Sequence, residues 1–154
     1  MSRTFESVQV GVTLTPLTIG PLTPVHLMRF SAAIENWHRI HYDERFAREH
    51  DGLPGLLISG SYKQHLAAQM VRAWAGPAAR LVRIGMQFRA MNVVGETLTA
   101  WGTVTERHTD GDLGVITCEI GIRNEDGVES TPGTATVALP VAGISAPAPT
   151  GLSR

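Results

Sequence analysis

The sequence predicts an α+β fold in which an antiparallel β-sheet wraps around one long central helix. Residues 61–75 place apolar side chains at helical spacing and fill several other positions with alanine, which is typical of a buried helix. After Pro77 the pattern changes, and apolar residues alternate with polar ones in four successive segments. This period of two is the signature of half-buried antiparallel strands. One helix packed on one curved sheet is an α+β arrangement.

Length and composition limit the class of protein. The chain has 154 residues, of which 43% are hydrophobic and 18% are charged, and this suffices for one domain with its own core. The net charge of −1 provides no basic field, so we expect no nucleic-acid partner. The sequence has no run of about 18 apolar residues, so we expect no membrane span.

The single cysteine and the two ends of the chain give further expectations. Cys118 alone excludes an internal disulfide and a cysteine-based metal cluster. The first residues lack the apolar core of a secretion signal, which predicts a cytoplasmic protein. Residues 1–140 are expected to form the domain, and residues 141–154, rich in Ala, Pro, Ser and Gly, a disordered tail.

The segment before the long helix is predicted to hold a strand and a helix. Residues 8–14 place Val or Leu at every second position, which predicts a strand. After a break at Gly20 and Pro21, Thr23 is a good N-cap and Pro24 suits the first helical position. Apolar residues at helical spacing then predict a helix from about 24 to 36. Residues 38–57 have weak periodicity, although a short helix over 43–50 fits them.

The long helix and the strands after it have clear boundaries. The apolar stripe of the helix consists of Tyr62, Leu66, Met70, Ala73 and Trp74. Gly76 and Pro77 end this helix. The alternating segments predict strands over 82–90, 98–104, 116–122 and 135–139. The pairs Asp110-Gly111 and Asp126-Gly127 are hairpin turns between them.

Residues 30–43 are the candidate site. The stretch holds two of the six histidines, His38 and His41, next to Asn36, Arg39 and Asp43. Titratable groups crowded at a helix end are costly to desolvate without partners, so such a cluster suggests a site. The alternative is a solvated helix terminus that carries two surface histidines.

These residues resemble the MaoC-like hydratases and dehydratases of acyl thioesters, which have the hotdog fold. The match is closer to a branch that includes mesaconyl-CoA hydratases and 3-hydroxyacyl-thioester dehydratase type 2. The residues shared with that branch's motif are Phe30, Ser31, Ala32, Asn36, His38, Arg39, Ile40, His41, Tyr42 and Asp43. Residues 53–61 resemble the branch's segment before the long helix, and residues 94–98 resemble its turn into the sheet.

Two departures from the wider family concern the site itself. Asn36 stands where most members have a catalytic aspartate, five residues before the histidine, although the closer branch shares this asparagine. The family's His-Gly before the long helix is Ser59-Gly60 here, and Ser61 replaces a proline. These two departures bear on the shape of the substrate that the site accepts.

The resemblance implies reversible addition of water across a trans-2-enoyl thioester, with no cofactor. His41 is the predicted general acid and base, because histidine titrates near neutral pH. Asn36 carries no proton at working pH but can hold the water. The backbone N–H of Gly60, at the start of the long helix, is the predicted oxyanion donor. Glu35 is a less favoured stand-in carboxylate, because helical geometry turns it about 100° from Asn36.

The remaining site residues are assigned to substrate binding or to structure. Ser59, Ser61, Arg39 and Tyr62 are predicted to bind the substrate, and Ser59 also suits a helix cap. Arg39 can pair with Asp43 or with a ligand anion, and the sequence does not decide between them. No metal site is expected, because His38 and His41 have no evident third ligand.

Three functions remain open at this stage. The first is a hydratase or dehydratase that acts as a homodimer on an acyl-CoA or acyl carrier protein thioester, since a dimer would cover the open edges of the sheet. The second is a non-catalytic or half-site subunit of a heteromeric hydratase. Some MaoC-like proteins of steroid side-chain degradation resemble this case. The third is a hotdog thioesterase, which is disfavoured because residues 56–70 hold no carboxylate.

Overall fold

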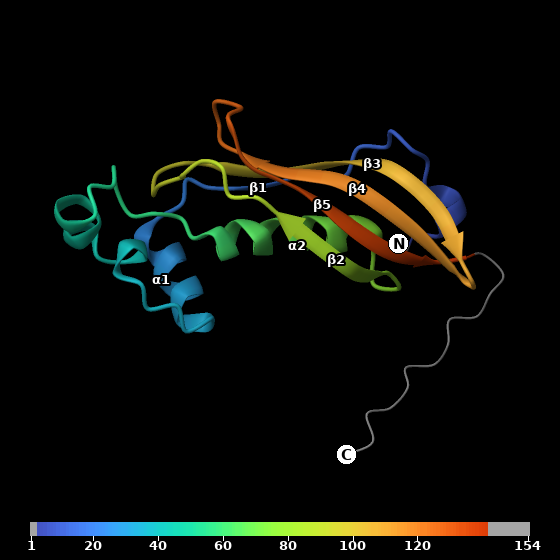
Figure 1. Ribbon diagram of the computed structural model, residues 1–154, viewed down its shortest axis with the longest axis horizontal. Helices are drawn as coiled ribbons and strands as arrows, with labels where there is room; N and C mark the ends of the chain where they lie inside the picture. The colour runs from blue at the N-terminus through green and yellow to red at the C-terminus, as the bar shows by residue number, and fades with distance from the viewer. Residues whose placement is uncertain (1–2, 142–154) are drawn as a thin grey trace, which may run out of the picture.

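The computed structural model describes residues 3–141, which fold into a five-stranded antiparallel sheet packed on one long helix (Figure 1). The strand order is β1-β3-β4-β5-β2. The strands are β1 (Leu17–Ile19), β2 (Arg80–Met86), β3 (Leu98–Asp110), β4 (Leu113–Arg123) and β5 (Glu129–Pro140). The long helix α2 (Gly60–Ala75) lies along one face of the sheet, so the predicted α+β arrangement is confirmed.

The core lies between α2 and the inner face of the three longest strands. Its sheet side is made by alternate residues of β3, β4 and β5: Leu98, Ala100, Val104, Ile116, Cys118, Ile120, Ile122, Ala135, Val137 and Leu139. Its helix side is made by Leu66, Met70, Val71 and Trp74. The period of two therefore identified the buried positions of these strands correctly. The turns at Gly111 and Gly127 have positive φ, of 57° and 78°, as the predicted hairpins require.

The strand predicted over residues 8–14 is wrong. The first strand is instead β1, and residues 8–14 run beside β3 through a few irregular bonds. Gly11 adopts a φ of 87° in a turn closed by the Val12 N–H and the Gln9 carbonyl, and this turn interrupts the pairing. Val10 is consequently exposed, although Val8 and Leu14 are buried.

The strand predicted over residues 82–90 ends four residues early, and although Ile84 and Met86 pack on the core as predicted, Val82 does not. A register shift between Leu81 and Arg83, where β2 pairs with β5, turns the side chains by one position. Leu81 and Ile84 therefore pack on the core, whereas Val82 is 51% exposed. Phe88, also predicted to face inward, lies beyond the strand and is 55% exposed.

Helix α1 (Pro24–Ala33) begins as predicted, with Thr23 as the N-cap, but ends three residues early. The N–H groups of Glu35 and Asn36 donate to the carbonyls of Ala32 and Ser31, which is the Schellman pattern of a helix end. Glu35 takes the left-handed position of this motif, with a φ of 54°, where glycine is usual. This turn redirects the chain toward the residues that precede α2.

Residues 39–58 form short turns beyond the N-terminal end of α2, on the same side as α1 (Figure 1). They include a 3₁₀ turn at Arg39–His41 and a π-helical turn at Phe46–His50, which replaces most of the short helix predicted over 43–50. Asp43 accepts a hydrogen bond from the Phe46 N–H and so caps this turn. Within residues 3–141 no helix has the length and apolar character needed to cross a bilayer. The predicted tail lies outside the described residues, except for Val141.

Candidate active site

His41 lies at the junction of the 3₁₀ turn and the segment that leads into α2. Its residue surface is only 7% exposed. The Leu57 N–H donates to the Ile40 carbonyl at 2.9 Å, and His41 Nδ1 lies 2.7 Å from the Leu57 carbonyl oxygen. Two hydrogen bonds therefore attach the 3₁₀ turn at Arg39–His41, called the histidine turn below, to the residues that immediately precede α2.

The contact with Leu57 determines which ring nitrogen of His41 can accept a proton. A carbonyl oxygen only accepts hydrogen bonds, so Nδ1 carries the proton in this contact and donates it. In the neutral ring Nε2 then has the free lone pair. The geometry thus prepares Nε2, and not Nδ1, to take a proton from a bound molecule.

The pKa of His41 lies below the ordinary histidine value of 6.5. Burial lowers it most, because it penalises the charged ring, and the nearby His38 lowers it further. The hydrogen bond to Leu57 acts in the opposite direction and raises it. His41 is therefore neutral, and able to accept a proton, at pH 7.

The first turn of α2 presents backbone N–H groups next to this histidine segment. Ser59 is the N-cap, and its Oγ accepts from the Tyr62 N–H at 3.2 Å while its carbonyl accepts from the Lys63 N–H. The N–H groups of Gly60 and Ser61 have no acceptor among residues 3–141, as expected for the start of a helix. Those two groups are free to bind an anionic or carbonyl oxygen.

An exposed aromatic ring lies over Gly60. A Cβ atom on Gly60 would come within 2.9 Å of the Phe88 ring, which is closer than real Cβ atoms approach. A side chain at position 60 would therefore displace the Phe88 ring, so glycine suits this position because of the close approach of Phe88 and not because of a positive φ. The sequence interpretation missed this residue, because it assigned Phe88 to the inner face of a strand.

Asn36 makes no hydrogen bond to His41 in the described structure. Its Oδ1 accepts a hydrogen bond from the His38 N–H at 3.3 Å, within the loop that follows α1. The rings of His38 and His41 lie 6.1 Å apart, centroid to centroid. Glu35 is exposed in its left-handed turn and makes no hydrogen bond to His41, so the geometry gives no support to a stand-in carboxylate.

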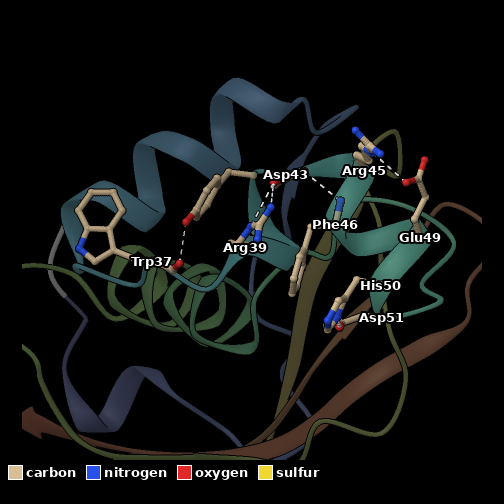
Figure 2. Close-up of polar contacts among 9 residues, drawn as sticks. Trp37, Arg39, Asp43, Arg45, Phe46, Glu49, His50 and Asp51 are labelled. Atoms are coloured by element: carbon tan, nitrogen blue, oxygen red, sulfur yellow. Dashed lines mark hydrogen bonds and ion pairs between the residues drawn. The ribbon is translucent and has the colours of Figure 1, made fainter.

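Arg39 is engaged within its own segment (Figure 2). Its Nη2 lies 2.7 Å from Asp43 Oδ2, and its guanidinium stacks over the Phe46 ring at 4.2 Å. Of the two alternatives left open by the sequence, the described structure shows the pair with Asp43. The Tyr42 hydroxyl donates to the Trp37 carbonyl at 2.7 Å.

Tyr62 and Ser61 occupy different surroundings. The Tyr62 ring meets the Phe30 ring edge-on at 5.0 Å and helps to line a groove of about 320 Å³ between α1 and α2. Ser61 is exposed, and its Oγ lies 3.2 Å from Ser59 Oγ. Within the described residues no group of three or more His, Cys, Asp or Glu side chains could hold a metal.

Comparison with the models of known families shows to which family the chain belongs. Residues 9–96, more than half of the chain, match the model of hydroxyacyl-thioester dehydratase type 2. The chain belongs to this family. The matched region contains the histidine turn and α2, so it covers the candidate site.

A characterised protein is similar to this dehydratase-family chain over a shorter stretch. Mesaconyl-C(4)-CoA hydratase from Chloroflexus aurantiacus is 43% identical over 49 residues. That stretch is 32% of this chain but only 18% of the relative. The relative is therefore much longer than the region the two proteins share.

Solved structures establish the hotdog fold of this family member. One chain of the ChsH1–ChsH2 complex from Mycobacterium tuberculosis superposes with a TM-score of 0.75 and 24% identity, over 85% of this chain and 98% of that one. An (R)-hydratase from A. caviae involved in PHA biosynthesis gives a TM-score of 0.79 and 22% identity, over 88% and 99%. The predicted hotdog fold is thus confirmed.

Proposed function

We propose that this protein catalyses the reversible hydration of a trans-2-enoyl thioester, or the reverse dehydration of a 3-hydroxyacyl thioester. The observation that carries the proposal is the direct attachment of His41 to Leu57, three residues before Gly60. A base with a defined free nitrogen is held beside a helix start that has free N–H donors. Family membership supports the same chemistry.

The reaction follows from the roles of these groups. His41 Nε2 takes a proton from a water molecule as the water oxygen bonds to Cβ and the Cα–Cβ π bond opens. The negative charge that develops on the thioester oxygen is stabilised by the Gly60 N–H and by the dipole of α2. The imidazolium of His41 then returns the proton to Cα. The dehydration runs through the same steps in reverse.

The other predicted site residues are proposed to bind and orient the attacking water and the substrate. Asn36 keeps its side-chain N–H groups available to hold the attacking water, since its Oδ1 is bonded to His38. Ser59 and Ser61 border the oxygen site, and Tyr62 faces the groove beside α1, where an acyl group would fit. Arg39 contributes through its pair with Asp43, which fixes the histidine turn.

The proposed substrate is an acyl-CoA, or alternatively an acyl carrier protein thioester. The named relative that shares 49 residues is a hydratase of a CoA thioester, which favours CoA. The strands β1 and β2 are open edges of the sheet, and a second copy or another hotdog subunit would cover them.

A second candidate is a subunit that works only in a heteromeric hydratase. Two observations favour it: one similar solved chain comes from the ChsH1–ChsH2 complex, and His41 has no carboxylate partner among residues 3–141. A partner subunit would then supply the missing acid or the rest of the substrate site.

An assay on the purified chain separates these candidates. Crotonyl-CoA, mesaconyl-CoA and a bulky steroid enoyl-CoA are offered in turn, and both the enoyl absorbance and free CoA are followed. Loss of the enoyl absorbance without CoA release is expected and supports a self-sufficient hydratase. Release of CoA would indicate a thioesterase and contradict the proposal, and turnover only after a second hotdog subunit is added would establish the heteromer.

A further inference from the structure

Lys63 is the only lysine in the sequence, and it is buried. The chain has 13 Lys and Arg residues, and all except Lys63 are arginines. Lys63 is 3% exposed and lies in the first turn of α2, three residues after Gly60. A buried cation is costly, and the positive end of a helix dipole makes this position less favourable still. Such a placement calls for compensating contacts.

A hydrogen-bonded network supplies those contacts. Lys63 Nζ donates to the Ala90 carbonyl at 3.0 Å and to Asn92 Oδ1 at 3.1 Å. Asn92 Nδ2 donates to Glu96 Oε2 at 2.8 Å, and Glu96 Oε1 accepts from the Val93 N–H at 2.7 Å. The network ties the first turn of α2 to the loop between β2 and β3, and Glu96 provides the opposite charge.

The same loop is also hydrogen-bonded to residues 56–58, which include the partner of His41, Leu57. The Ile58 N–H donates to the Asn92 carbonyl at 2.9 Å, and the Val94 N–H donates to the Leu56 carbonyl at 3.0 Å. Between these bonds Leu57 pairs with Val93 as an antiparallel bridge. Residues 56–58 therefore lie between two partners, the loop on one side and the histidine turn on the other.

We propose that Lys63, acting through Asn92 and Glu96, is the positioning residue that holds residues 56–60 so that His41 and the Gly60 N–H face one substrate. Lys63 touches neither reacting group, and its effect passes along the backbone pairing. A lysine suits this position because one compact ammonium meets two acceptors, whereas the planar guanidinium of arginine would need a wider space. The kinetic part of this inference rests on the proposed function, and its structural part does not.

The structural test is hydrogen exchange, which needs no substrate. Lys63→Met keeps most of the length of the side chain and removes the ammonium that makes both hydrogen bonds. Faster exchange is expected at the Ile58 and Val94 amides, while the core amide of Ile120 reports global unfolding. Arg72→Met, an exposed cation-to-methionine change on the same helix, is the matched control. Unchanged exchange at Ile58 and Val94 in a folded Lys63→Met protein would overturn the proposal.

The kinetic test asks whether position or only stability is affected. Misplacement of the reacting groups is expected to lower kcat roughly 10- to 100-fold in Lys63→Met, with KM within about twofold of the wild type. The acid limb of the pH profile of kcat/KM should also move, because His41 loses its fixed contact with Leu57. Lys63→Arg, which keeps the charge and donors, should recover part of kcat. A lower melting temperature with unchanged kcat and pH profile would show a purely structural lysine.

A milder variant covers the case in which Lys63→Met does not fold. Glu96→Gln keeps the size of the side chain, removes the negative charge and leaves one accepting oxygen in place of two, so changes in the same direction but smaller are expected. No change in exchange or in kcat for Glu96→Gln would contradict the network. If the wild type hydrates no enoyl thioester, the proposed function fails, and the exchange experiment still decides the role of Lys63.

Discussion

His41 Nδ1 donates a hydrogen bond of 2.7 Å to the Leu57 carbonyl, although the two residues are 16 positions apart in the chain. This bond fixes the ring tautomer and joins the histidine turn to the start of α2 in one contact. The proposed base and the proposed oxyanion donor are therefore connected through four residues, Leu57 to Gly60. Such preorganisation is what a hydratase requires of its reacting groups.

The pH dependence of activity should follow His41. Burial, the hydrogen bond to Leu57 and the charge of His38 together leave its pKa below 6.5. The neutral, active form therefore persists below pH 6.5, and the acid limb of kcat/KM should have its midpoint below that value. The folded state also binds a proton less readily than the unfolded one, so stability should fall as the pH is lowered from 6.5 through the folded pKa. A midpoint above 6.5 would contradict the described environment.

Gly60→Ala should reduce activity by bringing a methyl group against the Phe88 ring. The backbone at Gly60 tolerates alanine, so a loss would come from the displaced ring or the blocked approach to the N–H. The double variant Gly60→Ala with Phe88→Ala should therefore recover part of the lost kcat/KM. Steady-state kinetics of the two single variants and the double variant test the coupling. Additive losses would show that Phe88 and Gly60 act independently.

Cys118 should resist thiol reagents in the folded protein. The residue is fully buried in β4, and burial raises the pKa of its thiol to about 11. The thiolate, which is the reactive form, is therefore scarce as well as inaccessible. Labelling with a chromogenic disulfide should proceed at the rate at which the protein opens, and should become fast in denaturant. Rapid labelling of the native protein would contradict this burial.

The altered register of β2 predicts unequal costs for two neighbouring substitutions. Leu81→Ala removes a side chain that packs on the core and should cost about 2 kcal/mol of unfolding free energy. Val82→Ala removes an exposed side chain and should change it by less than about 0.5 kcal/mol. Urea denaturation of both variants measures the difference. A larger loss of unfolding free energy in Val82→Ala than in Leu81→Ala would contradict the register shift and would fit simple alternation instead.

The strands that the sequence predicted well are those whose pattern is uninterrupted. Along β4, Ile116, Cys118, Ile120 and Ile122 are all fully buried, as their period of two required. The segment at residues 8–14 has the same pattern, but the turn at Gly11 breaks its pairing with β3. Periodicity records which side chains are apolar and cannot report a turn or a bulge that shifts the register.

The sequence predicted only part of the candidate site, because its other features depend on how distant segments pack. The local motif identified His41 and Gly60 as candidates, and the structure places both at the N-terminal end of α2, while their catalytic roles remain predictions. The contact with Leu57 could not be predicted, because it depends on how two turns pack. Lys63 offered one signal, its being the only lysine, but its burial and its link to Asn92 exist only in the folded chain.

Hydration of crotonyl-CoA by the wild type and by His41→Asn tests whether His41 is the general base. Asparagine can still donate to the Leu57 carbonyl but cannot accept a proton as a base. The wild type should turn over the substrate, and a folded His41→Asn protein should lose roughly 10²- to 10⁴-fold in kcat. His108→Ala, an exposed histidine on β3, should be unchanged and is the control. Full turnover by His41→Asn would contradict the assignment of His41 as the base.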